Sequence, residues 1–365
     1  MSRSRWWFPD TGVESAHLAH AREFVDGLDY RDHIVAALVG GSRAAGLAHA
    51  RSDLDIIVVL ADGEDRSRHR TLPARHRGMT VDTDVLAVDD VRRHLDAQRI
   101  REAADVLDRS LYALPSHVVW STLVRLVTGH VVMGTPQARA LLESFDRDAV
   151  RRSAMVHDTL CLATFAEDAK GSVECGDLAT ALAASEEAVR YAAEVGLTAL
   201  DDLYVGRKYL LRRMARHEPL AALLESGNTL GQPDGSADDD EITGLIRRRL
   251  LLAGHLVGHA LTMGWEKPVD TLPPFTLRDE GPVRDPYLVP VRWPGGMALM
   301  TGVDVVRTLS EVEAVLWNLL DGHGVRDVVG EFAERMCRDI SSAGTYVHGV
   351  LGEWCRIGLV RRGQD

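Results

Sequence analysis

The sequence predicts an α+β protein with an amino-terminal mixed sheet, a following all-α helical bundle and a small third domain. Short apolar runs separated by helical stretches extend over residues 1–115, which is typical of a sheet covered by helices. From 116 to 265 the apolar residues recur at helical spacing, which predicts a helical domain. A proline-rich stretch at 266–286 is expected to be a semi-rigid linker, and residues 287–365 form the third unit.

Three strands are expected in the first domain. Residues 33–39 form a short apolar run, residues 53–60 a second and residues 79–88 a third. The first run leads into Gly40-Gly41-Ser42 and a small alanine-rich helix, so a tight turn is expected at the end of a buried strand.

Helices dominate the second domain, whereas the third unit mixes both kinds of element. Apolar residues at i, i+3 and i+4 predict four helices, which are Arg151–Ala169, Asp177–Val195, Leu200–Arg216 and Glu241–Trp265. Short β-like pieces follow at 287–293, 297–300 and 303–307. Ser310 and Glu313 then have the spacing of a capping box, which predicts the start of a helix.

Composition and charge exclude several classes of function. The chain of 365 residues has 42 Lys and Arg against 54 Asp and Glu, a formal net charge of −12, which argues against a long nucleic acid as partner. The four cysteines form no C-x-x-C pair, so no zinc knuckle or redox motif is expected. Neither a signal peptide nor the ~20 apolar residues of a membrane span is present, so a cytoplasmic protein with no membrane partner is expected.

Asp53 and Asp55 are the first candidate metal ligands. They lie two residues apart on a predicted strand, so their carboxylates leave the same face and lie close together. Two like charges at such a distance repel each other unless a cation lies between them. A hard divalent ion such as Mg²⁺ accepts carboxylate oxygens and keeps positions open for substrate phosphates. The pair therefore predicts a magnesium site.

The turn at Gly41 and Ser42 is a candidate phosphate-binding site. It joins a buried strand to a helix, where free backbone N–H groups favour an anion such as a triphosphate. Gly41 lets the backbone approach a phosphate, and the Ser42 hydroxyl can donate a hydrogen bond to it. Arg43 is a further candidate contact to the nucleotide, and the alternative is that it is an exposed helical arginine.

A third carboxylate is expected from the last of the three strands. Asp82 and Asp84 share one face of that strand, and either can join the first pair across adjacent strands. Three acidic groups allow two metal ions, one that activates an attacking hydroxyl and one that neutralises a pyrophosphate leaving group. The constellation therefore predicts phosphoryl transfer.

In these residues and their spacing, the chain resembles the DNA polymerase β-like nucleotidyltransferase superfamily, in particular its minimal and antibiotic-modifying members. The resemblance rests on Gly41-Ser42, ten intervening residues, Asp53-Leu54-Asp55 and a later Val-Asp-Thr. It implies the nucleotidyltransferase-fold mixed sheet, two Mg²⁺ ions and a nucleoside triphosphate whose α-phosphate is attacked by an acceptor, with release of pyrophosphate.

The same resemblance implies roles for single residues. Asp53 and Asp55 would hold the metal ions, while Gly41 and Ser42 would cradle the β- and γ-phosphates. Asp82 fits the third acidic position best and would help to deprotonate the acceptor. The other carboxylate of that strand, at position 84, stays open as the alternative.

The helical domain is similar in character to the bundles that shape the acceptor pocket in that superfamily. Antibiotic-type relatives often place a basic residue there toward the nucleotide, which makes Lys208 a candidate nucleotide-binding residue. Arg212 and His217 have the R-x4-H spacing of HEPN ribonucleases, which we interpret as coincidence. His255 and His259 have the i, i+4 spacing of a zinc helix but lack its glutamate, so we interpret them as structural.

The third unit resembles the PqqD-like winged helix-turn-helix domain, which binds leader peptides of ribosomally made, modified peptides. The resemblance rests on the apolar pattern of residues 309–322, a helix at 325–336 and a last helix that ends before Gly358. Such a domain offers a strand edge to which an extended peptide can add as a further strand. Basic residues are sparse in its helices, so DNA is the weaker choice of ligand.

The predicted function is Mg²⁺-dependent transfer of a nucleoside monophosphate, with AMP from ATP expected, to a hydroxyl or amine of a small molecule or a precursor peptide. Two alternatives stay open. One is an antitoxin-type nucleotidyltransferase that modifies a HEPN-like partner, and the other is a non-catalytic peptide- or DNA-binding adaptor. The sequence does not reveal the acceptor, because such pockets are built from scattered residues with no fixed spacing.

Overall fold

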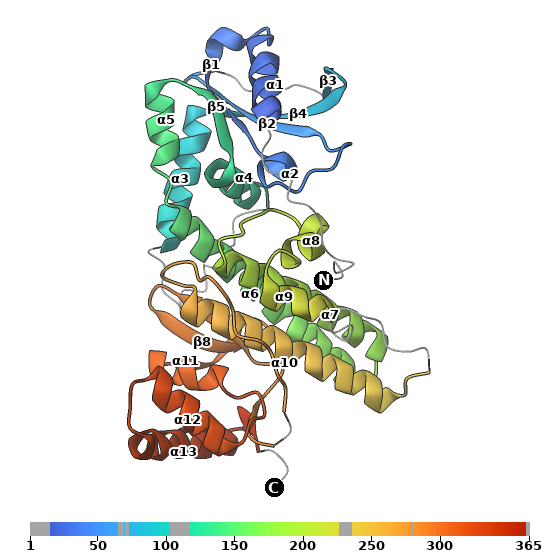
Figure 1. The fold of residues 1–365 in the computed structure, drawn as a ribbon, viewed down its shortest axis with the longest axis vertical. Coiled ribbons are helices and arrows are strands. Elements are labelled where there is room, and N and C mark those ends of the chain that lie inside the picture. Colours follow the sequence, from blue (N-terminus) through green and yellow to red (C-terminus); the bar gives the residue numbers. More distant parts are fainter. Residues whose placement is uncertain are drawn as a thin grey trace.

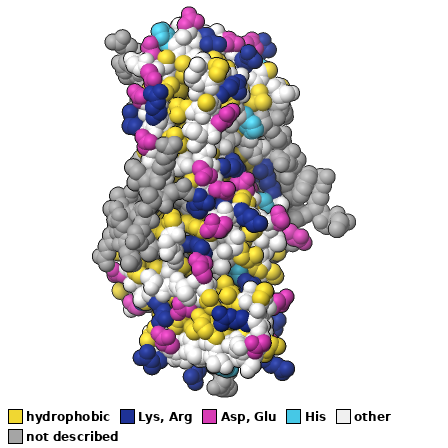
Figure 2. Space-filling model, turned by 90° about the vertical axis from the view of Figure 1, so that its left-hand side faces the viewer, with side chains coloured by type: hydrophobic (Ala, Val, Ile, Leu, Met, Phe, Trp, Pro, Cys, Tyr) yellow, Lys and Arg dark blue, Asp and Glu magenta, His cyan; other side chains and the backbone are white. Residues whose placement is uncertain are grey.

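The protein is elongated, with a sheet at one end, three long helices in the middle and a smaller unit at the other end (Figure 1). The computed structural model describes residues 15–64, 69, 73–102, 117–225, 236–278 and 280–362. The start of the chain and the predicted boundary at residue 115 lie outside these residues. Within them, no helix is both long and apolar enough to cross a bilayer. Acidic and basic side chains are interspersed on the face that Figure 2 shows, without a broad basic area.

The amino-terminal part contains a five-stranded mixed sheet, which confirms the predicted fold class. The strands lie in the order β3-β4-β2-β1-β5, with β2 and β4 parallel and the other pairs antiparallel. Three strands were expected from their apolar runs, and the short β3 and the later β5 were not. The strands are β1 (Ile34–Val39), β2 (Leu54–Leu60), β3 (Ala74–His76), β4 (Met79–Ala87) and β5 (His130–Gly134).

Helices cover both faces of this sheet, because alternate residues of the strands are apolar on both sides. One face packs against α1 (Ser15–Asp26). The other face packs against α3 (Val88–Glu102), α4 (His117–Thr128) and α5 (Pro136–Glu143). The sheet and its helices thus extend beyond the predicted 1–115 domain, since β5 forms hydrogen bonds with β1.

The middle of the molecule is a bundle of three long helices, which confirms three of the four helices expected there. They are α6 (Arg147–Glu174), α7 (Leu178–Ala199) and α10 (Asp239–Met263). Each begins at an aspartate whose side chain accepts a hydrogen bond from the first turn, as helix N-caps do. These caps are Asp146, Asp177 and Asp238.

The fourth predicted helix, Leu200–Arg216, is wrong over most of its length. The chain turns at Asp201 and Gly206, where φ is +62° and +88°. The reason is tertiary, because the fully buried Arg213 donates hydrogen bonds to Asp202 and so ties the loop back. Only short elements remain, namely η4 (Arg207–Tyr209), α8 (Leu210–Met214) and α9 (Glu218–Glu225).

The C-terminal unit is a three-stranded antiparallel meander followed by three helices. The predicted capping box of Ser310 and Glu313 is present and begins the first of these helices. Its elements are β6 (Val283–Arg284), β7 (Val289–Trp293), β8 (Gly296–Thr301), β9 (Asp304–Leu309), α11 (Glu311–Asn318), α12 (Val325–Arg335), α13 (Ile340–Arg356) and β10 (Val360–Arg361). The two short strands β6 and β10 pair with each other and close the unit.

The proline-rich stretch 266–286 is packed against the bundle and does not stand free as a spacer. Leu272 is 2% exposed, and the ring of Phe275 lies 5.2 Å from that of His255 on α10. One continuous hydrophobic core runs from α6, α7 and α10 through the meander to α13. The bundle and the C-terminal unit therefore share a single core.

Candidate active site

Three carboxylates from two neighbouring strands form the centre of the candidate site. Asp53, Asp55 and Asp82 each offer an oxygen atom, and these atoms all lie within 4.8 Å of one another. The strands bring this about, since Asp55 on β2 lies directly opposite Asp82 on the parallel strand β4. In the part of the chain that the structure describes, no other group of three His, Cys, Asp or Glu side chains is arranged to hold a metal ion.

Asp84, the alternative third carboxylate, lies outside this cluster. It pairs in register with Ile57, two residues further along the two strands. Its Oδ2 accepts a hydrogen bond from Nη1 of Arg125 at 2.5 Å. The geometry therefore brings Asp82 to Asp53 and Asp55, and gives the other carboxylate of β4 a basic partner.

The turn between β1 and the short helix α2 (Gly41–Ala44) lies against the acidic cluster. The Gly40 N–H donates to the backbone oxygen of Asp55 at 2.9 Å, which joins the turn to β2. Gly41 has φ +64°, and a Cβ atom there would lie 1.9 Å from Oδ2 of Asp55. Only glycine fits between the turn and the carboxylate. The Ser42 side chain is buried beside it.

A pocket of about 150 Å³ opens over these residues. Five of the predicted site residues line it, and four of them, Gly41, Ser42, Asp53 and Asp55, belong to the sheet domain. The fifth is Lys208, which lies on η4, after the loop that follows α7. The rest of the lining is supplied by α4, α2 and the same loop, and consists of Ala45, Val124, Arg125, Thr128, Tyr204, Val205 and Tyr209.

The electrostatics of the pocket favour a bound cation. Burial raises the pKa of Asp55, and the charge of Asp53 raises it further, whereas Arg125 acts in the opposite direction. Burial also raises the pKa of Tyr204 to about 12, with smaller contributions from Tyr209 and Asp55. The carboxylates are therefore held together at an energetic cost that a metal ion would remove.

Arg43, expected as a nucleotide contact or an exposed helical side chain, is neither in this structure. Its side chain is 5% exposed and is not part of the pocket lining. Its Nε donates to the backbone oxygen of Asp53 at 3.0 Å and Nη2 to that of Ser52 at 2.5 Å, while Nη1 lies 2.7 Å from Nε2 of His17. Arg43 thus holds the segment that carries the first carboxylate.

Sequence reasoning missed three side chains of the pocket. Arg125 lies in no motif, and no local signal indicates that α4 would reach the site. Tyr204 and Tyr209 lie in no motif either, and they pack against each other with ring centroids 6.0 Å apart while they line the pocket. They come close to the site because the chain leaves α7 in a loop.

The two pairs with suggestive spacing are structural, as expected. Arg212 donates to the backbone oxygen of Leu47, and His217 binds the carboxylate of Asp202. His255 and His259 are buried with their rings 4.5 Å apart. Burial lowers the pKa of both, in His259 to about 3, so both are neutral.

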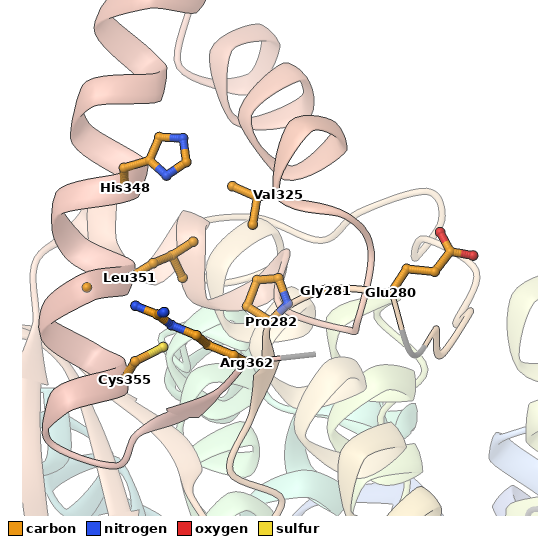
Figure 3. Close-up of a pocket in the computed structure, with 9 residues that line it drawn as sticks. Glu280, Gly281, Pro282, Val325, His348, Leu351, Cys355 and Arg362 are labelled. Carbon is orange, nitrogen blue, oxygen red and sulfur yellow. The ribbon is translucent and has the colours of Figure 1, made fainter. Parts of the chain in front are cut away.

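A larger pocket of about 320 Å³ lies in the C-terminal unit, between α12 and α13, at the opposite end of the molecule from the strands β2 and β4 (Figure 1). His348, Leu351 and Cys355 on α13 form one wall, and Val325 at the start of α12 faces them (Figure 3). Glu280, the only carboxylate in its lining, points away from the other side chains. The smaller pocket is therefore the candidate active site, because among the described residues only there do three carboxylates converge.

Comparison with known families agrees with this geometry. Residues 21–115 match the family model described as a nucleotidyltransferase domain. The chain therefore contains a nucleotidyltransferase domain, and enzymes with such a domain take a nucleoside triphosphate and a divalent metal ion. The matched residues include the turn, α2 and all three carboxylates.

Among solved structures, the chain is similar to a nucleotidyltransferase-like protein from Exiguobacterium sibiricum. The two share 12% sequence identity with a TM-score of 0.36, and the match covers 70% of this chain and 77% of that chain. No curated protein matches the chain. The family match ends before the C-terminal unit, so the PqqD-like character of that unit stays a prediction.

Proposed function

We propose that the protein transfers a nucleoside monophosphate, with AMP from ATP expected, to a hydroxyl or amine of an acceptor and releases pyrophosphate. The observation that carries this proposal is the convergence of Asp53, Asp55 and Asp82 beside the turn at Gly41 and Ser42. Carboxylates that meet next to a strand-to-helix turn suit a triphosphate and its metal ions together.

The donor set fits magnesium. All three groups are carboxylates, which are the hard oxygen ligands that Mg²⁺ prefers, and neither histidine nor cysteine takes part. Asp53, Asp55 and Asp82 would hold the ions. When bound, magnesium supplies charge neutralisation of the phosphates and a lower pKa of the attacking hydroxyl.

The chain's own residues would do the remaining work. The backbone at Gly41 and the hydroxyl of Ser42 would bind the β- and γ-phosphates. Asp82, on the exposed face of β4, would accept a proton from the acceptor. Lys208 would contact the nucleotide from the loop of the helical domain. These groups bind and orient the substrate, which is the main requirement of phosphoryl transfer.

Incubation with each α-labelled nucleoside triphosphate and Mg²⁺ tests the reaction. We expect pyrophosphate release and label transfer with the wild type, and a loss of at least about 100-fold with Asp53→Asn or Asp55→Asn. Asp89→Asn is the matched control, because Asp89 forms an exposed ion pair with Arg92 on α3. A non-catalytic adaptor predicts neither turnover nor metal-dependent nucleotide binding.

A precursor peptide is the acceptor that one further observation favours. β9 is an edge of the three-stranded sheet and exposes Val305 and Val306, which are 36% and 45% exposed, and Val303 just before it is 60% exposed. Hydrophobic side chains also gather over the lower part of the face in Figure 2, at the height of the C-terminal unit. An extended peptide could add to this edge as a strand. A short peptide encoded by a neighbouring gene should then accept label, and Val305→Glu should weaken its binding.

A further inference from the structure

The strongest unassigned feature of the site is a basic side chain on α4. The aliphatic part of Arg125 lies beside the turn, since a Cβ atom at Gly40 would lie 3.9 Å from Cβ and Cγ of Arg125. Its guanidinium reaches across to β4, where Nη1 donates to Oδ2 of Asp84 at 2.5 Å. Arg125 therefore spans the distance between the phosphate-binding turn and the strand that carries Asp82.

Arg125 is one of two basic side chains in the lining of a pocket that also contains two carboxylates. Asp53 and Asp55 line the pocket, and among the described lining residues only Arg125 and Lys208 are basic. The positive charge of Arg125 acts on Asp55 and on Tyr204. A triphosphate that enters beside these carboxylates needs nearby positive charge in addition to that of the metal ions.

The ion pair with Asp84 is not explained by stability. The side chains of Arg125 and Asp84 are 34% and 62% exposed, and ion pairs with such exposure contribute little to folding. Within the described part of the chain the Arg125 side chain forms one hydrogen bond, whereas a guanidinium carries five N–H donors in a planar fork. The remaining donors suit the two oxygens of a phosphate group.

We propose that Arg125 binds the phosphates of the nucleotide, and that Asp84 is a positioning residue which holds the guanidinium toward them. The proposal rests on the proposed nucleotidyl transfer and adds one binding group and one positioning group to that site. It also accounts for the second exposed carboxylate on β4, which the acidic cluster does not use.

Equilibrium binding tests the proposal without turnover. The probes are Mg²⁺ with α,β-methylene-ATP and Mg²⁺ with pyrophosphate, titrated by calorimetry into the full-length protein. We expect Arg125→Gln to weaken the binding of both by about 10- to 100-fold. Arg125→Lys should restore part of the affinity, because lysine keeps the charge and an aliphatic chain but not the planar fork. Arg92→Gln is the matched control, since Arg92 forms exposed ion pairs with Asp62 and Asp89.

A double-mutant cycle tests the role of Asp84. Asp84→Ala should weaken binding of the ATP analogue by a few-fold while Arg125 is present, and should cause no such loss in the Arg125→Gln background. A merely structural residue would lower the melting temperature and leave the coupling at zero. Equal losses in both backgrounds, or tighter binding on Asp84→Ala, would overturn the positioning role.

The outcomes separate this proposal from the proposed function. If the wild type binds the ATP analogue and Arg125→Gln binds it within twofold, then Arg125 does not contact the phosphates and nucleotidyl transfer is unaffected. If the wild type binds neither probe in the presence of Mg²⁺, the proposed function itself fails.

Discussion

At the scale of single residues, the candidate site depends on the close contact between Gly41 and Asp55. The positive φ of Gly41 turns the backbone toward the carboxylate, and no room is left for a side chain. Glycine at this position thus allows both the turn and the close approach of the strand that carries Asp55.

Gly41→Ala should inactivate the enzyme while the fold persists. Its methyl group would have to displace the Asp55 carboxylate, and such a displacement costs about 100-fold in turnover. Gly78→Ala is the matched control, because Gly78 has φ +83° and no atom within 4 Å of its Cβ position. Steady-state pyrophosphate release and circular dichroism of both variants check this, and equal activity of the two would contradict it.

Asp55→Asn should stabilise the protein in the absence of metal. The substitution removes a partly buried charge that its acidic neighbours repel, so the melting temperature should rise by about 2 °C. Millimolar Mg²⁺ should raise the melting temperature of the wild type and leave that of the variant unchanged. Thermal unfolding with and without Mg²⁺ measures both effects. An equal Mg²⁺ shift in the two proteins would show that Asp55 is not a ligand.

At the scale of elements, the loop after α7 decides which side chains of the helical domain reach the pocket. Arg213 is fully buried and donates to Glu194 at 2.6 Å and to Asp202 at 3.0 Å. Burial alone raises the pKa of Asp202, but hydrogen bonds and charge from His217 and Arg213 outweigh it and lower the pKa to about 2. This buried network fixes the loop that forms in place of the predicted helix, and Lys208, which follows that loop, lines the pocket.

Asp202→Asn should lower the free energy of unfolding by about 2 kcal/mol at pH 7. Because the folded pKa lies below the ordinary value of 3.8, the contribution of Asp202 is complete above about pH 4 and is lost as the pH falls toward 2. Urea unfolding at pH values from 7 to 3 should show the difference shrinking below pH 4.

The neighbouring residue supplies the control for this pH dependence. Asp201→Asn removes an ion pair with Arg147 in which both side chains are about 40% exposed, and asparagine tolerates the positive φ of that position. We expect a change of less than about 0.5 kcal/mol at every pH. A constant effect of Asp202→Asn down to pH 3 would contradict the assignment.

At the scale of the whole molecule, the chain has two kinds of interior. The sheet has its own apolar clusters on its two faces, and the bundle shares one core with the C-terminal unit. Four tryptophans lie in the shared core, namely Trp265, Trp293, Trp317 and Trp354. The C-terminal unit is therefore built into the helical domain, and its unfolding would expose the bundle.

The close crossing of α10 and α11 provides a test of this shared core. Gly258→Ala should destabilise it by about 1–3 kcal/mol, since its Cβ would lie 2.1 Å from Oδ1 of the buried Asn318. Gly244→Ala on the same helix meets no atom within 4 Å and should stabilise the helix by about 0.5–1 kcal/mol. Urea unfolding followed by tryptophan fluorescence reports both. A separate transition for the C-terminal unit would contradict a shared core.

Local periodicity made the catalytic part of the fold predictable. The acidic pair at Asp53 and Asp55 and the carboxylates of β4 follow from the alternation of side chains along a strand, which holds in any protein, and the turn at Gly41 follows from glycines after an apolar run. The strands β3 and β5 were missed, because β3 is only three residues long and β5 belongs to the sheet solely through its pairing with β1.

The sequence by itself determined the acidic residues, the glycine turn and therefore the class of chemistry, since each depends on neighbours only a few residues away. Only the tertiary structure decided that Asp82 joins the cluster and that Lys208 lines the pocket. It also decided that Arg43 forms hydrogen bonds with the backbone that carries Asp53. The physical reason is that these outcomes depend on how strands pair and how buried charges find partners, and such contacts join residues far apart in the chain.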